Sequence, residues 1–348
     1  MSKIHIINTI NFFRSKKYRV GFYIPNVFSL YHRAMASTRF RVYDQIIHFF
    51  NDREYVVELF NPFKRYDILI FQKVFSDEAV ECAKKAKKNG TRIVLDLNVN
   101  YLDEQSKLIS SQQRKKVHTF IEISDYILTT TYYIAKQVSL HFSDKLVTVI
   151  PENIETFGIR KKILSFQQDK IIRLVHVGHA HKLGDLHLIS DQLKKLADKY
   201  PVEILILTNK RIDVDFGYPR LKVRTKKFNR WNQKLIFTDL TWGDIFIAPR
   251  DLTETYNLGH SFDKIGRPMS VGLPVIASPV PSYKDSPAIL INNFDDTWRE
   301  KIEYFLTHPD EYWNLSKKGI EYCAQYVDPT VVMRHYREFF DTITQSHD

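Results

Sequence analysis

The sequence predicts an α/β protein made of two doubly wound domains, and three observations lead to this fold class. Short apolar runs alternate with longer helix-like stretches along the chain. Most of these runs are rich in Val, Ile and Leu without clean alternation, a pattern typical of strands buried on both faces of a parallel sheet. The length of 348 residues suffices for two domains of ordinary size. We therefore expect two Rossmann-like sheets with right-handed crossovers, facing each other across a cleft.

The first domain is expected to span residues 1–152 and to contain six strands. Their predicted ranges are residues 19–24, 55–60, 67–71, 92–97, 126–129 and 146–150. Residues 77–88 have the pattern of a helix, and Asn89 and Gly90 are expected to end it because glycine readily adopts a left-handed conformation. Another helix is expected to begin at Ser37 or Thr38, because either hydroxyl can cap a helix N-terminus.

The second domain is expected to span residues 153–328, after a seam at Pro151, Glu152 and Asn153. A polar, weakly periodic stretch at residues 156–170 follows the seam, and then the alternation of strands and helices restarts. The predicted strands are residues 172–177, 202–207, 221–223, 245–248, 274–277 and 288–291, and the predicted helices are 186–199, 296–306, 310–326 and 329–343. We expect the C-terminal helix, within residues 329–348, to cross back to the first domain.

Composition and charge restrict the class of partner without choosing one. The apolar content of 44% and the charged content of 26% are those of a globular protein. A formal net charge of +11 suits anionic partners, which include nucleic acids, acidic membrane surfaces and phosphorylated substrates. The two cysteines, Cys82 and Cys323, lie far apart in helix-like contexts, so neither a disulfide framework nor a metal cluster is expected. This cysteine usage favours a reducing, cytoplasmic compartment.

The chain has no run of about 18 apolar residues, so no transmembrane helix is expected. Its N-terminal segment lacks the long apolar region and the small-residue cleavage site of a secretory signal. The segment combines apolar and basic residues, namely Ile4, Ile6, Ile7, Ile10, Phe12, Phe13, Lys16, Lys17 and Arg19. Such an element either packs on the body of the protein, which we favour, or lies on a membrane surface.

Residues 261–278, SFDKIGRPMSVGLPVIAS, form the most informative motif. A polar turn from Ser261 leads into a short helix, and the Gly272-Leu273-Pro274 sequence separates this helix from a buried strand. A helix N-terminus attracts anions because its backbone N–H groups are free and its dipole is positive there. Lys264 and Arg267 fall on one helical face and add two positive charges. The segment is therefore either a diphosphate site or a basic surface helix before a core strand.

Five stretches in this order resemble the GT-B glycosyltransferases, specifically the retaining group with a Glu-x7-Glu pattern. SDYILTTT (124–131) resembles the last strand of the family's N-domain, and VIPENIE (149–155) resembles its interdomain hinge. LVHVGH (174–179) resembles the glycine turn that opens the C-domain, and WGDIFIAP (242–249) resembles the strand before the donor loop. Residues 261–278 resemble the family's phosphate-binding helix. The resemblance covers residues 125–345 well and the first 120 residues loosely.

The resemblance implies transfer of a sugar, with retention, from a nucleotide-diphosphate donor to a glycan or lipid-linked acceptor. Surface polysaccharide or glycolipid synthesis at the inner face of the membrane fits the basic charge. No metal is expected, because no Asp-x-Asp motif stands at a strand end of the donor half. Three departures from the family pattern are plain: Gly259 and Arg267 occupy the glutamate positions, and His179 occupies the position of an arginine.

The candidate donor-binding residues follow predicted strands. Lys264 and Arg267 would stabilise the charge of the leaving diphosphate, and His179 and Lys182 are the second choice for it. Gly178 would allow a close backbone approach to the ligand, or would simply form a tight turn. Asn209, Lys210, Arg250, Asp251 and Ser261 are further candidates, although a solvated charged turn explains Asn209 and Lys210 equally well.

The candidate acceptor residues belong to the first domain. Tyr31, Arg39 and Arg41 follow its first strand, and the two arginines could reach a phosphate on the acceptor or pair with carboxylates. Asp96 stands at the end of a buried strand, where it could orient or deprotonate an acceptor hydroxyl or cap the next helix. In a retaining enzyme the leaving phosphate can itself act as the base.

Two other functions stay open at this point. A GT-B relative could epimerise or hydrolyse a nucleotide sugar instead of transferring it. A non-catalytic binding or scaffold protein on a degenerate transferase fold would explain the missing glutamates and the charge. A nucleic-acid partner is not expected, because the basic residues do not gather into one run and no recognised binding module is present.

Overall fold

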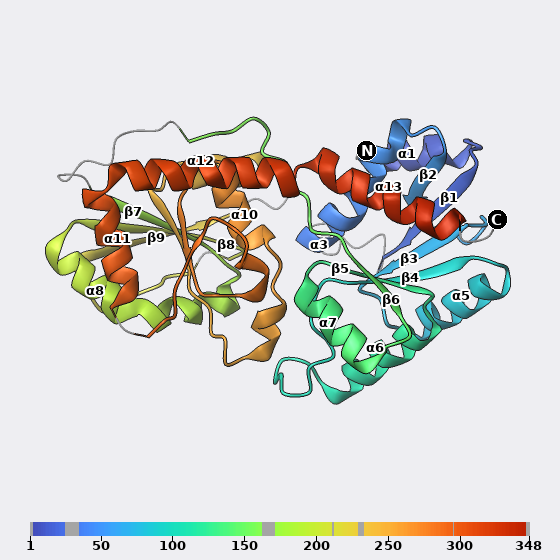
Figure 1. The fold of residues 1–348 in the computed structure, drawn as a ribbon, viewed down its shortest axis with the longest axis horizontal. Helices are drawn as coiled ribbons and strands as arrows, with labels where there is room; N and C mark the ends of the chain where they lie inside the picture. Colours follow the sequence, from blue (N-terminus) through green and yellow to red (C-terminus); the bar gives the residue numbers. More distant parts are fainter. Residues whose placement is uncertain are drawn as a thin grey trace. The chain divides into compact units, whose positions relative to one another are not determined.

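The computed structural model describes residues 3–24, 35–161, 171–210, 212–228, 233–294 and 296–345. These residues form two parallel six-stranded sheets (Figure 1). One compact unit comprises residues 1–153, 259–261 and 329–348, and the other comprises residues 154–258 and 262–328. Each unit has its own sheet and its own core, as the alternation in the sequence predicts.

The first sheet has the strand order β2-β1-β3-β4-β5-β6, and every neighbouring pair is parallel. Its strands are β1 (Tyr18–Tyr23), β2 (Tyr55–Leu59), β3 (Ile68–Gln72), β4 (Arg92–Leu97), β5 (Tyr126–Thr129) and β6 (Leu146–Val149). The predicted strands are therefore confirmed, with small differences at their ends. β3 consists entirely of buried residues, which explains its continuous apolar pattern.

Helices cover this sheet. They are α1 (Lys3–Phe12), α3 (Ala36–Thr38), η1 (Arg39–Tyr43), α4 (Asp44–His48), η2 (Phe49–Asn51), α5 (Asp77–Lys88), α6 (Ser111–Ile123), α7 (Tyr132–His141) and α13 (Pro329–Gln345). α13 buries Tyr336 and Phe340 in the same core as Val20 and Ile70 of the sheet. The last helix of the chain thus packs on the first sheet. Gly90 has a φ of +86° just after α5, as a glycine that closes a helix requires.

The helix start expected at Ser37 or Thr38 is wrong. α3 begins at Ala36, with Met35 as its N-cap residue and no side-chain capping bond. Thr38 is buried and donates a hydrogen bond to Gln72 Oε1 over 3.4 Å. Its hydroxyl therefore binds the end of β3 and does not cap the helix. Arg39 consequently follows α3 and does not lie in a capped first turn.

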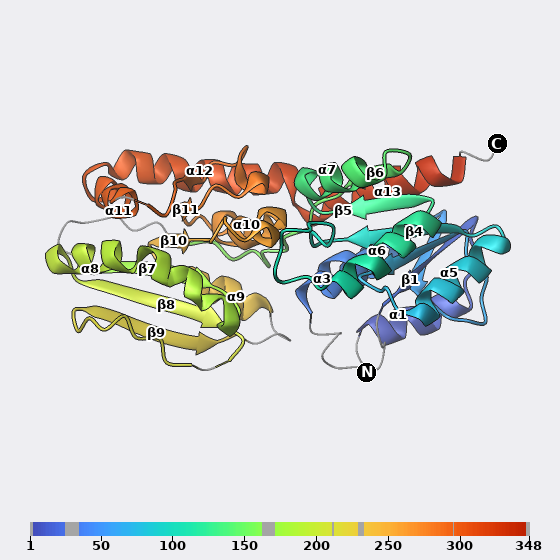
Figure 2. The same cartoon turned by 90° about the horizontal axis from the view of Figure 1, so that it is seen from below.

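The second sheet has the order β12-β11-β10-β7-β8-β9, and it is also parallel (Figure 2). Its strands are β7 (Ile172–Val177), β8 (Val202–Thr208), β9 (Leu221–Lys227), β10 (Ile245–Ala248), β11 (Val275–Ala277) and β12 (Ile289–Leu290). β9 continues four residues beyond the predicted end at residue 223. It is an edge strand with alternating burial, so its outward positions carry polar side chains that obscure the strand pattern.

The helical segments around the second sheet are η3 (Ala180–Ile189), α8 (Ser190–Lys199), α9 (Gln233–Leu240), η4 (Thr255–Gly259), α10 (Asp263–Ser270), η5 (Pro281–Tyr283), α11 (Thr297–Thr307) and α12 (Pro309–Tyr326). α10 ends where the sequence predicts, and Gly272 adopts a φ of +89° after it. Cys82 and Cys323 are both free thiols. Among the described helices, none combines the length and the apolar character needed to cross a bilayer.

Candidate functional site

Charged side chains gather at the carboxyl edge of the second sheet, which is where open parallel sheets bind ligands. Lys264 lies in the first turn of α10, and its ammonium donates a hydrogen bond to the carbonyl oxygen of Val177 at the end of β7. Arg250 follows β10 and forms an ion pair with Asp185, whose Oδ2 lies 2.6 Å from the arginine Nη1. The sheet edge therefore brings together Lys264 and Arg250, which the sequence placed in separate candidate loops.

The positive charges at this edge act on one another. Burial lowers the pKa of the Lys264 ammonium well below its ordinary value. Arg250 and Lys182 lower that pKa further, whereas Asp185 and Asp263 raise it. Like charges near one another favour an anion beside them, and in the structure Asp185 supplies one such charge to Arg250. The group formed by Lys182, Arg250 and Lys264, which we call the cation cluster, is therefore a candidate site for an anionic ligand.

Hydrogen bonds fix the backbone of Arg250. Its N–H donates to Ser278 Oγ over 2.8 Å, and its carbonyl oxygen accepts from Asn293 Nδ2 over 2.7 Å. Ser278 Oγ in turn donates to Asn293 Oδ1 over 2.7 Å. This closed network, together with the ion pair to Asp185, holds the guanidinium in one place. A ligand at this edge would meet a preorganised charge, because the position of Arg250 is set before binding.

Arg267 has a carboxylate partner on its own helix. Its guanidinium pairs with Asp263 of the same helix, with Nε 2.7 Å from Oδ1 and Nη2 2.9 Å from Oδ2. The carboxylate one turn earlier on the helix neutralises this cation. The ion pair with Asp263 does not test whether Lys264 and Arg267 together bind a diphosphate, so this role stays a prediction. In the structure, Arg250 and Lys182 are the cations that act on Lys264.

Gly178 is required by packing within the protein. A Cβ atom at this position would lie 2.9 Å from Nε2 of His176, so any larger residue would displace that ring. His176 is buried, and its Nδ1 donates to the carbonyl oxygen of Ile247 over 2.9 Å. Burial lowers the pKa of His176 well below its usual range, with a further contribution from Lys264, so the ring is neutral at pH 7.

His179 and Lys182 frame the start of η3. The ring of His179 lies 5.7 Å from that of His181, centroid to centroid, and 6.1 Å from that of Phe228. Lys182 Nζ lies 4.8 Å from the centroid of the Tyr256 ring, within the range of a cation–π interaction. The structure thus relates Lys182 to the cation cluster and places His179 in an aromatic group beside it.

The other predicted donor residues have local partners. Asn209 Oδ1 accepts a hydrogen bond from the backbone N–H of Ala180 over 2.8 Å, which fastens η3 to the end of β8. Lys210 is exposed in the following turn. Asp251 accepts from the backbone N–H of Thr253 over 2.9 Å and from its hydroxyl over 2.6 Å. Asn209 and Asp251 therefore shape the loops, and their contact with a donor stays a prediction.

In the first unit, Arg41 and Asp96 bind each other. The guanidinium Nε lies 2.6 and 2.8 Å from the two carboxylate oxygens, and Nη1 donates to the carbonyl oxygen of Ile150 over 2.7 Å. Both side chains are almost fully buried. Burial opposes both charges and raises the pKa of Asp96, whereas the attraction between the two groups raises the pKa of Arg41. Of the two alternatives for Arg41, the structure shows pairing with a carboxylate, while a role of Asp96 as a base stays a prediction.

The remaining candidates differ in what the structure shows. Arg39 places its guanidinium 4.6 Å from the ring centroid of Phe40. The hydroxyl of Ser261 donates to the carboxylate of Glu152, which it meets within the first unit. Tyr31 lies outside the described residues. Ser261 is thus not part of the second unit, where the sequence placed it as a donor residue.

The missing first glutamate has a steric explanation. A Cβ atom on Gly259 would lie 2.9 Å from Cβ of Asn100 and 3.3 Å from its backbone nitrogen. Any side chain at this position, a glutamate included, would have to displace the backbone of Asn100. Glycine stands at position 259, in place of the glutamate of the Glu-x7-Glu pattern, where the first unit leaves no room for a side chain beside Asn100.

Sequence reasoning missed Asp185, Asn293 and Tyr256, and no short pattern marks them. Asp185 lies within a 3-10 segment that resembles a surface turn, and Asn293 follows the two-residue strand β12. Their importance depends on contacts with Arg250, which is far away in the sequence. Contacts between residues so far apart in the sequence can be identified only from the folded structure.

The fold is shared with solved glycosyltransferase structures. HepE of Anabaena in complex with UDP matches with a TM-score of 0.66 and 10% identity, over 93% of this chain and all of that one. TarM of S. aureus, in complex with fondaparinux, alpha-GlcNAc-glycerol and UDP, matches with a TM-score of 0.59 and 12% identity, over 79% of this chain. A trehalose-6-phosphate synthase matches with a TM-score of 0.55 and 13% identity, over 87% of this chain and 82% of that one.

These likenesses establish the fold. The chain spans about half of TarM, with 55% of that protein covered. No family model and no curated protein matches the sequence. The two parallel sheets and the structural neighbours together confirm the prediction of a GT-B fold with two Rossmann-like domains.

Proposed function

We propose that this protein is a glycosyltransferase that moves a sugar from a nucleotide-diphosphate donor to a glycan or lipid-linked acceptor. The observation that carries the proposal is the cation cluster at the carboxyl edge of the second sheet, beside the first turn of α10. Neighbours of the same fold support the donor class, since HepE is known in complex with UDP-glucose and with UDP. Transfer to a hydroxyl is the reaction that this donor class serves.

The cation cluster is suited to stabilise a leaving diphosphate. As the bond between the sugar and the phosphate breaks, negative charge grows on the phosphate oxygens. Arg250 is already fixed by its hydrogen bonds, and the depressed pKa of Lys264 rises again once an anion arrives. Preorganised donors of this kind act mainly on the transition state, and one such contact is worth about 2.7–4 kcal/mol. The helix dipole of α10 adds to the same effect.

We also propose that transfer proceeds with retention and without a metal ion. Support for retention comes from the family resemblance and from the buried Arg41–Asp96 pair, which leaves Asp96 without the freedom of a general base. The leaving phosphate would then accept the proton of the acceptor hydroxyl from the same face of the sugar. Support for metal-free transfer comes from the fixed positive charges of the cation cluster, which serve the role of a divalent ion.

A contact with an anionic membrane is the further element of the proposal. α1 packs on the edge strand β2 through Asn8, whose Oδ1 accepts from Leu59 N–H over 3.1 Å, and Asn11, whose Nδ2 donates to Val57 O over 3.0 Å. Ile6 and Ile10 of α1 are 49% and 41% exposed, and Phe13, which follows the helix, is 81% exposed. A helix with apolar residues on both sides needs a second apolar surface to cover it.

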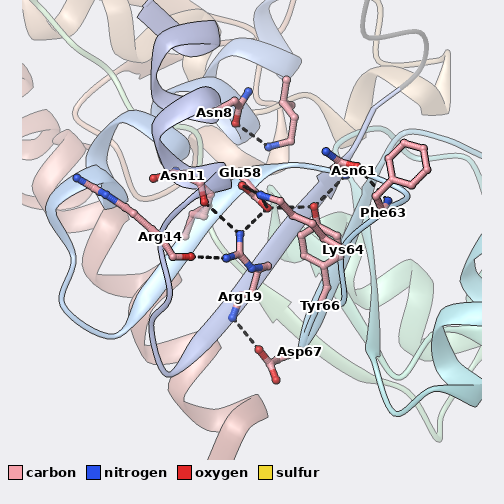
Figure 3. Close-up of polar contacts among 12 residues, drawn as sticks. Asn8, Asn11, Arg14, Arg19, Glu58, Asn61, Phe63, Lys64, Tyr66 and Asp67 are labelled. Atoms are coloured by element: carbon pink, nitrogen blue, oxygen red, sulfur yellow. Dashed lines mark hydrogen bonds and ion pairs between the residues drawn. The ribbon is translucent and has the colours of Figure 1, made fainter.

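Two cations near this helix have a carboxylate partner within the first unit. Arg19 and Lys64 converge on the buried carboxylate of Glu58, with distances of 2.8 and 2.9 Å (Figure 3). Phe63, next to Lys64, is 93% exposed. Exposed apolar side chains on a protein of formal net charge +11 match the interface of an anionic bilayer, where lipid-linked acceptors reside.

A calorimetric titration with UDP, GDP, ADP, CDP and dTDP tests the donor assignment. At least one diphosphate should bind the wild-type protein, and Lys264→Ala should weaken that binding. Lys318→Ala is the matched control, because Lys318 is exposed on α12 and makes no ion pair within the described part of the chain. Binding of none of the five diphosphates contradicts the proposed function. Binding without turnover of any nucleotide sugar would instead indicate a non-catalytic binding protein.

A further inference from the structure

Several buried polar atoms at the carboxyl edge of the first sheet have no hydrogen-bond partner in the described structure. They are Nε2 of Gln72, Oδ1 of Asn98, Oδ1 of Asn100 and Oγ1 of Thr130. Gln72, Asn100 and Thr130 are at most 4% exposed. Because nearly all buried polar groups in proteins are paired, a set of unpaired ones calls for an explanation, and a ligand that supplies the partners is one.

The strand register brings these residues to neighbouring positions. Gln72, the last residue of β3, is aligned with Asp96 of β4, and Leu97 of β4 is aligned with Thr129 of β5. Asn98 and Thr130 therefore follow aligned strand ends, beside Gln72. The unpaired atoms of Gln72, Asn98 and Thr130 therefore belong to one row across the ends of three adjacent strands, at the edge where open parallel sheets bind ligands, and Asn100 follows two residues after Asn98.

Lys73 stands in the same row with a strained backbone. It follows β3 directly with a φ of +54°, a conformation uncommon for residues other than glycine and often found at functional sites. Its N–H donates to the carbonyl oxygen of Asp96 over 3.3 Å. Its ammonium makes no hydrogen bond or ion pair with any described residue. Burial lowers the pKa of Lys73, and the carboxylates of Glu152 and Asp96 partly offset this effect.

The chemistry of the row indicates a neutral, hydroxyl-rich ligand. The amide nitrogen of Gln72 donates, the amide oxygens of Asn98 and Asn100 accept, and the hydroxyl of Thr130 does both. A phosphate or carboxylate only accepts hydrogen bonds, so it would leave the amide oxygens unpaired. Sugar hydroxyls donate and accept. Nη2 of Arg41, whose Nε binds Asp96, is a further unpaired donor, and a sugar hydroxyl can accept from it. The charges nearby balance in number, because Asp96 pairs with Arg41 and Glu152 acts on Lys73.

We infer that this row, from Gln72 and Lys73 to Thr130, binds a neutral sugar ring of the acceptor, with the ammonium of Lys73 donating to one of its hydroxyls. The inference rests on the proposed function and adds the class of acceptor and the residues that hold it. Lys73 is a positioning residue here, because it orients the acceptor and takes no part in bond breaking. Its unusual backbone is then the means of turning the side chain towards the ligand.

Two variants separate this role from a structural one. Thr130→Val keeps the shape of the side chain and removes an unpaired buried hydroxyl, so it should raise Tm while weakening sugar binding. A purely structural role for Thr130 predicts a lower Tm with sugar binding unchanged. Lys73→Asn keeps a residue that tolerates the left-handed conformation and removes the ammonium. Lys136→Ala is the matched control, because Lys136 is exposed on α7 and pairs with none of the described carboxylates.

The probes are methyl glycosides of glucose, galactose and N-acetylglucosamine, together with glucuronic acid and glucose 6-phosphate. Binding is measured by saturation-transfer NMR, in the presence of the nucleotide diphosphate that the protein prefers. At least one neutral glycoside should bind, and Thr130→Val and Lys73→Asn should each weaken it about tenfold or more. Both variants and Lys136→Ala should keep the wild-type affinity for the nucleotide, which also shows that they are folded.

Three results would overturn the inference: binding of the acidic probes alone, binding of no neutral glycoside, or neutral-glycoside binding that neither variant changes. Loss of the proposed function is a separate outcome. It would appear as an absence of nucleotide binding by the wild-type protein, whatever the sugar probes do.

Discussion

Replacement of Lys264 by methionine tests the role of the cation cluster most directly. Methionine is of similar length and apolar, so Lys264→Met removes the ammonium and keeps most of the packing around α10. A hydrogen bond between charged groups contributes about 1.5–3 kcal/mol, so the dissociation constant for the nucleotide diphosphate should rise roughly 10- to 150-fold. If the ammonium also stabilises the transition state, kcat should fall about 100- to 1000-fold. Calorimetry and initial-rate measurements give the two values separately.

The same variant makes a prediction about stability and pH. The folded state lowers the pKa of Lys264, so the unfolded chain retains the Lys264 proton to higher pH than the folded chain. The free energy of unfolding should therefore rise as the pH increases from the folded pKa towards about 10.4, the pKa of an unperturbed lysine. Lys264→Met should remove this part of the pH dependence, as urea unfolding between pH 7 and pH 10 would show. Unchanged nucleotide affinity in Lys264→Met, together with an unchanged pH dependence of stability, would refute the reasoning.

Four further predictions concern other parts of the chain. Asp96→Asn leaves the buried charge of Arg41 without its counterion, so urea denaturation should show a loss of about 3–5 kcal/mol in the free energy of unfolding. A variant that loses activity but keeps the wild-type stability would contradict a structural role for this pair. Gly259→Glu should not restore donor binding by a glutamate. It should lower Tm, with a loss of about 1–3 kcal/mol in the free energy of unfolding, because the new side chain collides with Asn100. Treatment with EDTA should leave the transfer rate unchanged, and recovery of a lost rate by added Mg²⁺ would show a metal requirement. Ile10→Ser should reduce binding to phosphatidylglycerol vesicles roughly tenfold, as measured by flotation. If the wild-type protein does not bind these vesicles, a membrane contact at α1 is excluded.

The fold was largely predictable because it depends on local patterns. Buried parallel strands are continuous apolar runs, and β4, β5, β7 and β10 have the predicted bounds. The edge strand β9 was predicted too short, since half of its side chains face solvent and carry charge. The start of α3 was misplaced because the hydroxyl of Thr38 bonds to Gln72, a residue more than thirty positions away.

The candidate site was predictable only in part, for a reason that Arg267 and Arg250 illustrate. The sequence identifies both as cations near a helix or strand end, but it does not show that Asp263 neutralises Arg267 or that Asp185 and Asn293 fix Arg250. For Arg41 the sequence leaves a phosphate or a carboxylate as partner, and the structure pairs it with Asp96 in a buried ion pair.

The sequence by itself determined the class of fold, the order of strands and helices along the chain, and the loops in which charged groups stand. Those features follow from the periodicity of apolar side chains and from the conformational preferences of glycine and proline, which act over a few residues. Only the tertiary structure decided which charges are paired and which polar groups are left without partners. It also decided that Lys73, with its left-handed backbone conformation, lies beside those groups. Electrostatic and hydrogen-bonding partners are chosen by proximity in space, and the folded sheet edges bring together residues that are far apart in the chain.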